Sequence, residues 1–193
     1  MKGNRMHREF IKLPGLLVFA AALALASACN GSNPDGQPVR NTGHYAIIET
    51  ERGTMVVELY PAVAPKTVAN FETLTNKGFY NGLTWHRVVP DFVIQGGDPD
   101  GTGMGGPGYN VPAEIDKKEH HLRGTLATAR QGDQSNPQRE SSGSQFYICL
   151  EPQPGLDGDY TIFGAVIKGM DVADQIQKGD HMKKITLAKE PPK

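Results

Sequence analysis

The sequence is poor in cysteine, with only Cys29 and Cys149 among its 193 residues. Two cysteines cannot build the framework of several disulfides found in small secreted domains. We predict no disulfide, because Cys29 is expected to be modified and Cys149 then has no partner. Long apolar runs are also missing. The run Leu16–Leu25 is too short to span a bilayer as a helix.

Motifs for nucleophilic, nucleotide and metal chemistry are absent as well. Residues 141–145 lack the Gly-x-Ser-x-Gly pattern of many hydrolases. Residues 101–106 have dinucleotide-type glycine spacing, but Gly-Pro-Gly follows where a helix would have to begin. In a strand, the adjacent His120 and His121 would point to opposite faces, and no further ligand stands at zinc spacing. We therefore predict neither a metal nor a cofactor.

The first 28 residues are typical of a secretory signal peptide. Basic residues precede the apolar run, and Ala26-Ser27-Ala28 precede Cys29. A cysteine directly after small residues resembles the bacterial lipobox, in which the thiol is lipidated and becomes the new N-terminus. The same small residues also suit ordinary cleavage, so plain secretion is the alternative. We predict a lipid anchor at Cys29 and an exported, membrane-anchored protein of the cell envelope, facing the periplasm or the cell exterior.

Residues 29–43 are predicted to be the lipidated N-terminus and a flexible tether, because they contain almost no apolar side chains. Thirteen flexible residues would reach about 20 Å. The folded domain is expected over 44–188, with a polar tail over 189–193. Removal of residues 1–28 takes away four basic residues and one acidic residue, which leaves 16 basic and 20 acidic residues and a net charge of −4. This charge disfavours nucleic acid as a partner. We expect the chain to act as a monomer.

The predicted domain combines many short strands with two helices. Residues 45–50 and 54–60 form a hairpin signal, and further strands are expected over 122–129, 144–150, 160–167 and 184–187. One helix begins at Pro65, with Val68, Phe71 and Leu74 on one face and Gly78 beyond its end. A second is expected over Met170–Gln177. Such a composition favours an antiparallel barrel or a sandwich, which periodicity does not distinguish.

A candidate site lies in Trp85–Asp98, where one arginine and one glutamine stand among apolar and aromatic residues. Two short strands joined by a tight corner would bring Arg87, Phe92 and Gln95 close together. A cation, a ring and an amide could then share one shallow surface.

Four segments of the sequence resemble the cyclophilin peptidyl-prolyl isomerases: WHRVVPDFVIQGGD (85–98), GTGMGGPGY (101–109), GSQFYI (143–148) and LDGDYTIFG (156–164). They occur in the family's order, and the likeness covers roughly residues 44–188. The resemblance implies a mainly β fold, a closed eight-stranded antiparallel barrel capped by two α-helices, with the substrate groove on its outer face. It implies catalytic roles for Arg87 and Gln95, and substrate-binding roles for Phe92, Val93, Ala129, Gln145, Tyr147, Leu156 and Tyr160.

The sequence also departs from the eukaryotic family pattern. Tyr147 and Tyr160 replace a phenylalanine and a histidine, and Arg130 replaces an asparagine beside the groove. Gly155 stands where the family has a tryptophan that holds cyclosporin, so we expect weak inhibition by that drug. The loop from Gln131 to Ser142 is longer than usual.

The residues and the resemblance agree on the chemistry. Rotation about an X-Pro bond has a barrier of about 18–20 kcal/mol, and lowering it requires a pocket for the proline ring and donors that favour the twisted amide. We predict a peptidyl-prolyl cis-trans isomerase that assists the folding of exported, proline-containing polypeptides. The alternative is a non-catalytic chaperone module that binds proline peptides in the same groove. Arg87 and Gln95 favour catalysis, since binding alone does not require the arginine.

Overall fold

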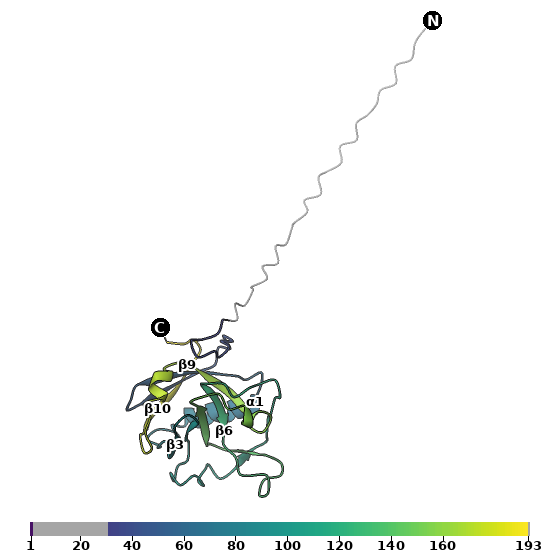
Figure 1. Ribbon diagram of the computed structural model, residues 1–193. Coiled ribbons are helices and arrows are strands. Elements are labelled where there is room, and N and C mark those ends of the chain that lie inside the picture. The colour runs from purple at the N-terminus through teal and green to yellow at the C-terminus, as the bar shows by residue number, and fades with distance from the viewer. Residues whose placement is uncertain (2–30, 193) are drawn as a thin grey trace.

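The computed structural model describes residue 1 and residues 31–192 (Figure 1). The predicted signal peptide and Cys29 lie outside the described residues. In chain order the elements are β1 (Tyr45–Thr50), β2 (Thr54–Leu59), α1 (Pro65–Asn76), β3 (Arg87–Val89), β4 (Val93–Gly96), β5 (Asn110–Val111), β6 (Thr125–Thr128), β7 (Ser141–Ser142), β8 (Phe146–Cys149), the 3-10 turn η1 (Pro154–Leu156), β9 (Ile162–Lys168), α2 (Met170–Ala173) and β10 (Met182–Ala188). No helix of the described part is long and apolar enough to cross a membrane.

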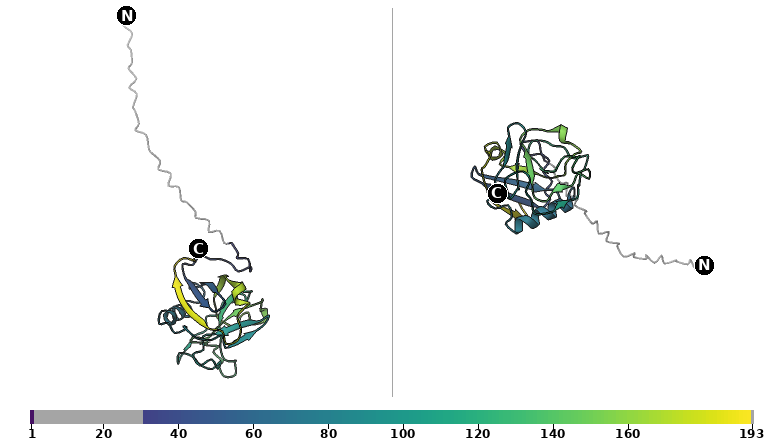
Figure 2. Two further views of the ribbon diagram at one scale, coloured as in Figure 1. Left: turned by 90° about the vertical axis from the view of Figure 1, so that its left-hand side faces the viewer. Right: turned by 90° about the horizontal axis from the view of Figure 1, so that it is seen from below.

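Eight strands form one antiparallel sheet in the order β10-β1-β2-β9-β6-β8-β4-β3, while β5 pairs with β7. The prediction of a closed barrel is wrong, because the edge strands β3 and β10 do not form a ladder with each other and the sheet curls into an open half-barrel (Figures 1 and 2). Strand β3 has only three residues. The segment before β3 reaches the start of β10 through loop hydrogen bonds, such as Gly82 N to Met182 O at 2.7 Å, and one isolated bridge joins Thr84 to His181, just before β10.

The main core lies inside the curl of the sheet, under α1. Pro65 opens this helix, and Val68, Phe71 and Leu74 are buried, as their three-residue spacing predicts. The ring of Phe71 packs edge-on against Phe146 of β8, with 5.7 Å between ring centroids. Burial of these apolar faces fixes the helix against the sheet.

The outer face of β4, β6, β8 and β9 carries a second apolar cluster. Tyr147 and Cys149 of β8 belong to this cluster, whereas their neighbours Phe146 and Ile148 belong to the main core. The strand is therefore buried on both faces, following the period of two of an extended chain. The second cluster forms the base of the site described below.

The second helix is shorter than predicted, because α2 ends at Ala173 rather than at Gln177. Beyond it the chain tightens: Gln175 N donates to Val172 O and Ile176 N donates to Ala173 O, each bond spanning three residues. Ile176 remains buried through this turn. The predicted start of the helix at Met170 is thus correct, while its predicted length is not.

The residues before β1 (31–43) are not the flexible tether that their composition predicts. Asn33 donates to a backbone carbonyl of β9 at 2.9 Å. Gln37 is buried, and its amide donates to Arg123 O and to Thr125 Oγ1, both at 2.8 Å. A polar segment can order in this way when backbone acceptors on the folded domain match its donors. Composition does not reveal such a match.

The second half of this segment is held by a carboxylate. Glu58 of β2 is completely buried, and its two oxygens accept the backbone N–H groups of Arg40 at 2.8 Å and Thr42 at 2.7 Å. The guanidinium of Arg40 lies 3.8 Å from the ring centroid of Tyr60 and pairs with Glu119 at 2.6 Å. We call residues 33–42 the N-terminal strap.

Candidate functional site

The corner between β3 and β4 places the predicted cation, ring and amide together. Arg87 and Gln95 face each other in the antiparallel register, and Arg87 Nη1 donates to Gln95 Oε1 at 3.4 Å. The guanidinium carbon of Arg87 lies 5.4 Å from the ring centroid of Phe92. Asp91 turns the corner with a positive φ of 57°. The proximity predicted from strand periodicity is therefore confirmed.

A row of amides extends inward from Arg87. Gln95 Nε2 donates to Gln145 Oε1 at 3.0 Å, and Gln145 Nε2 donates in turn to the carbonyls of Gly103 and Gly105 at 3.0 and 2.8 Å. Each amide therefore presents its oxygen toward Arg87 and its nitrogen toward the glycine loop. Hydrogen bonds in such a chain polarise one another, so the row orients the exposed guanidinium.

The glycine loop is built around Asp98, which is almost wholly buried. Burial alone would raise the pKa of Asp98, but hydrogen bonds from the backbone N–H groups of Asp100, Gly105 and Gly103 outweigh it and lower the pKa. A Cβ at Gly105 would lie only 2.0 Å from Asp98 Oδ1, so this position admits no side chain. The loop is a structural support for Gln145, because its carbonyls accept from the Gln145 amide.

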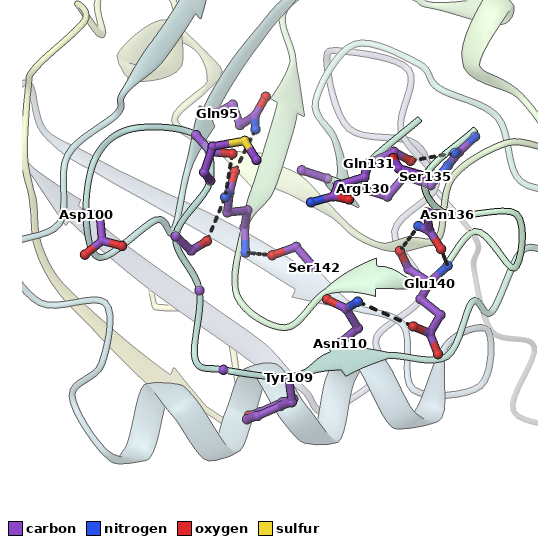
Figure 3. Close-up of a pocket in the computed structure, with 17 residues that line it drawn as sticks. Gln95, Asp100, Tyr109, Asn110, Arg130, Gln131, Ser135, Asn136, Glu140 and Ser142 are labelled. Atoms are coloured by element: carbon purple, nitrogen blue, oxygen red, sulfur yellow. Dashed lines mark hydrogen bonds between the residues drawn. The ribbon is translucent and has the colours of Figure 1, made fainter. Parts of the chain in front are cut away.

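Two hollows adjoin this row. The smaller, about 220 Å³, is lined by Arg87, Phe92, Val93, Gln95, Ala129, Arg130, Tyr147, Leu156 and Tyr160. The larger, about 600 Å³, is polar and lies between the glycine loop and the loop that follows β6 (Figure 3). Gln95, Ala129 and Arg130 belong to both hollows and form the ridge between them.

The structure brings the predicted site residues together with one difference in placement. Arg87, Gln95 and six of the seven predicted substrate-binding residues line the smaller hollow. Gln145 instead lines the larger one and reaches the smaller only through its bond to Gln95. The residues come from β3, β4, β6, β8 and the segment around η1, which the sheet order places side by side.

Arg130 is a site residue that the sequence-based set omits. Its side chain is only 7% exposed, and its guanidinium carbon lies 4.7 Å from the ring centroid of Tyr160. It donates to Asp159 O at 2.8 Å and to Asp133 Oδ1 at 2.5 Å. Arg139 pairs with both Asp133 and Asp159, so the long loop is tied to the wall of the smaller hollow. The departure at Arg130 was the available signal in the sequence, but two of its partners, Asp159 and Tyr160, are distant in sequence.

Three further side chains near the site, His120, His121 and Cys149, are of types that could bind a metal or act as a nucleophile. His120 and His121 lie in a loop rather than a strand, so the prediction of opposite orientation is wrong, and both rings contact Asp157. Burial raises the pKa of the Cys149 thiol to about 12, which makes it a packed side chain rather than a nucleophile. Within the described residues, no three histidine, cysteine, aspartate or glutamate side chains gather so that they could hold a metal ion.

Known proteins are similar to this chain in sequence and in structure. Residues 45–192 match the family described as cyclophilin type peptidyl-prolyl cis-trans isomerase/CLD. Peptidyl-prolyl cis-trans isomerase B of Bacillus subtilis is 48% identical over 148 residues, which are 76% of this chain and 97% of that protein. A crystal structure of a cyclophilin type peptidyl-prolyl cis-trans isomerase from Cryptosporidium parvum superposes with a TM-score of 0.70 at 31% identity, covering 77% of this chain and 99% of the other. A structure of the same protein in the presence of the dipeptide Ala-Pro gives a TM-score of 0.68 at 30% identity, covering 74% of this chain and 98% of the other.

Proposed function

This chain belongs to the cyclophilin-type peptidyl-prolyl cis-trans isomerases and is such an isomerase, and we propose that its smaller hollow grips the proline ring while Arg87 assists rotation. The single observation that carries this assignment is the position of Arg87 in the wall of the smaller hollow, beside apolar and aromatic side chains and hydrogen-bonded to Gln95. The Ala-Pro dipeptide named with the related crystal structure supports proline peptides as ligands.

The walls of the smaller hollow suit a proline ring. Phe92, Val93, Tyr147 and Leu156 provide apolar and aromatic surface on several sides. Proline lacks a backbone N–H, so its ring can enter such a surface without leaving a donor unsatisfied. A polypeptide held there would continue over the ridge into the larger polar hollow, whose walls can accept the residues that flank the proline.

Arg87 supplies the electrostatic part of the mechanism. As the amide twists, conjugation is lost and the lone pair localises on the proline nitrogen, which then accepts a hydrogen bond that the planar amide cannot accept. The guanidinium is always protonated and can donate that bond, while Gln95 holds the peptide backbone. A group that acts only on the twisted form raises the rate rather than the affinity.

The magnitudes show that Arg87 does not act alone. An acceleration of about a millionfold corresponds to about 8 kcal/mol, whereas one hydrogen bond to a charged group contributes about 1.5–3 kcal/mol. The remainder must come from selective binding of the twisted amide by the whole groove.

The test is prolyl isomerisation of a short X-Pro peptide by the full chain and by Arg87→Ala. We expect kcat/KM to fall by about 10- to 150-fold, the equivalent of one charged hydrogen bond. Arg87→Lys should recover only part of the rate, because the ammonium lacks the planar fork. Arg52→Ala removes an exposed arginine of the β1–β2 turn and serves as the matched control. Equal activity of wild type and Arg87→Ala would contradict this mechanism, while an inactive protein that still binds proline peptides would favour the binding-only alternative.

We also propose that the protein is exported and that Cys29 is lipidated. Its clients would then be exported polypeptides, and the protein would act on them as a monomer. The support is the sequence pattern before Cys29. Because the N-terminal strap is bound to the domain, such an anchor would hold the domain close to the membrane rather than about 20 Å away.

Metabolic labelling with radioactive palmitate tests the anchor. Wild type should carry label in the membrane fraction of the cell envelope, and Cys29→Ser should carry none. Cys149→Ser is the matched control and should label like wild type. Unlabelled wild-type protein that is found cleaved outside the membrane would instead support plain secretion.

A further inference from the structure

A buried histidine lies directly behind the wall of the smaller hollow. The side chain of His121 is 0% exposed, and its ring stacks on that of Tyr147 with 6.1 Å between centroids and 14° between planes. His121 itself does not line the hollow. Burying an imidazole is unfavourable unless both ring nitrogens find partners. Both do: Nδ1 lies 2.9 Å from Asp157 Oδ1, and Nε2 lies 3.0 Å from the Tyr147 hydroxyl.

The chemistry of the three groups fixes the direction of these bonds. Burial would raise the pKa of Asp157, but hydrogen bonds from the His121 N–H and from the rings of His120 and His121 lower it, so Asp157 is a carboxylate that only accepts. Burial lowers the pKa of His121, so its ring is neutral. The proton then lies on Nδ1, and Nε2 is left to accept. Tyr147 donates to it, since burial raises the pKa of the phenol and keeps it protonated.

The same aspartate holds a second part of the wall. Asp157 lies in the segment that carries Leu156 and Tyr160, both of which line the hollow. Asp157 Oδ1 accepts the backbone N–H of His121 at 2.8 Å, and Gln153 N donates to His121 O at 2.7 Å. His121 is therefore tied on one side to the segment 153–157 and on the other to Tyr147 of β8.

From this geometry we propose that His121 and Asp157 are positioning residues that hold the Tyr147 ring and the Leu156–Tyr160 segment at a fixed separation, so that the hollow is preformed for a proline ring. The proposal rests on the assignment of the smaller hollow to proline. Neither residue touches the reacting amide. Their effect is on the contacts to the proline ring itself, which keeps its shape as the amide twists, whereas the rest of the groove selects the twisted form. It should therefore appear in KM rather than in kcat.

The two links of His121 can be separated by substitution. An asparagine amide reaches the position of Nδ1 and can keep the bond to Asp157, but it is too short to meet Tyr147. A glutamine amide reaches the position of Nε2 and can accept from the Tyr147 hydroxyl. Tyr147→Phe removes that hydroxyl and keeps the ring, so it is the mildest of these changes. If the His121 variants do not fold, the result for Tyr147→Phe decides whether the proposal holds.

The experiment measures kcat and KM of the full chain with a short X-Pro peptide, and the Kd of the Ala-Pro dipeptide by calorimetry. We expect Tyr147→Phe and His121→Asn each to raise KM and Kd about three- to tenfold, with kcat changed less than twofold. His121→Gln should return KM to within about twofold of wild type, because its amide can still accept from Tyr147 and the backbone N–H of residue 121 still bonds Asp157. The KM of the double variant Tyr147→Phe/His121→Asn should be no higher than that of the poorer single variant, because each substitution removes the same hydrogen bond between Tyr147 and residue 121. Tyr80→Phe, a buried tyrosine of the main core, is the control and should leave KM unchanged.

Unchanged KM and Kd in Tyr147→Phe would overturn the proposal. Equal losses in the asparagine and glutamine variants would do the same, because a general packing role does not distinguish their reach. A fall in kcat without a change in KM would also contradict it. These outcomes are distinct from failure of the isomerase assignment, which would appear as an inactive wild type in the same assay.

Discussion

The N-terminal strap provides a sharp test of the structure, because its composition predicts flexibility and its contacts indicate order. Glu58 is the decisive residue: it is completely buried and accepts the backbone N–H groups of Arg40 and Thr42. Glu58→Gln changes one oxygen to an NH2 group. The remaining oxygen can accept from one of the two backbone N–H donors, whereas the amide NH2 faces the other N–H and cannot accept from it.

The magnitude follows from these contacts. One hydrogen bond to a charged acceptor becomes a neutral one, which costs about 1 kcal/mol, and one partly buried N–H loses its acceptor, which costs about 1–3 kcal/mol. The sum is about 2–4 kcal/mol. For a domain of this size, 1 kcal/mol shifts Tm by roughly 2–4 °C, so Tm should fall by about 4–16 °C.

Urea titration and thermal unfolding, both followed by circular dichroism, measure the effect. The matched control is Glu49→Gln, at an exposed position of β1, which should change the free energy of unfolding by less than about 0.5 kcal/mol. If Glu58→Gln unfolds within 2 °C of wild type, at about the precision of the assay, the strap does not contribute to stability and the reasoning is wrong.

Two further predictions follow from other parts of the molecule. The free energy of unfolding should decrease as pH falls below about 6.5, because burial lowers the pKa of His86 and of His121 in the folded state, so that these histidines are protonated first in the unfolded chain. The slope of the free energy against pH should approach about 1.4 kcal/mol per pH unit for each proton. Urea unfolding from pH 7 to 5 measures this slope, which should be smaller in His121→Gln. A pH-independent stability would contradict these depressed values. Cyclosporin should inhibit wild type weakly, and Gly155→Trp should tighten inhibition at least about tenfold, or about 1.4 kcal/mol. The substitution can be accommodated, since a Cβ at this exposed glycine meets no atom within 4 Å. Equal inhibition of both proteins would show that the missing indole is not the cause of the weak inhibition.

Much of the site could be predicted from the sequence because its residues are neighbours in one hairpin. Arg87, Phe92 and Gln95 lie within nine positions of each other, and the period of two of a strand brings them together without further information. The helix at Pro65 could be predicted for a similar reason, since its apolar spacing and its end signals are local. The family resemblance added Ala129, which follows β6, and the residues of β8 and the η1 segment.

The tertiary structure alone decided three other features. The sheet stays open because β3 is too short to pair along β10, and strand patterns do not encode how two edges meet. The N-terminal strap is ordered because Gln37 donates a hydrogen bond to Thr125 and because Glu58 accepts from two backbone N–H groups, although its composition predicts a flexible tether. His121 belongs to the site only because folding places Asp157 and Tyr147 on either side of it, 36 and 26 residues away. Local patterns determine elements, whereas polar partners far apart in sequence are matched only when the chain is packed.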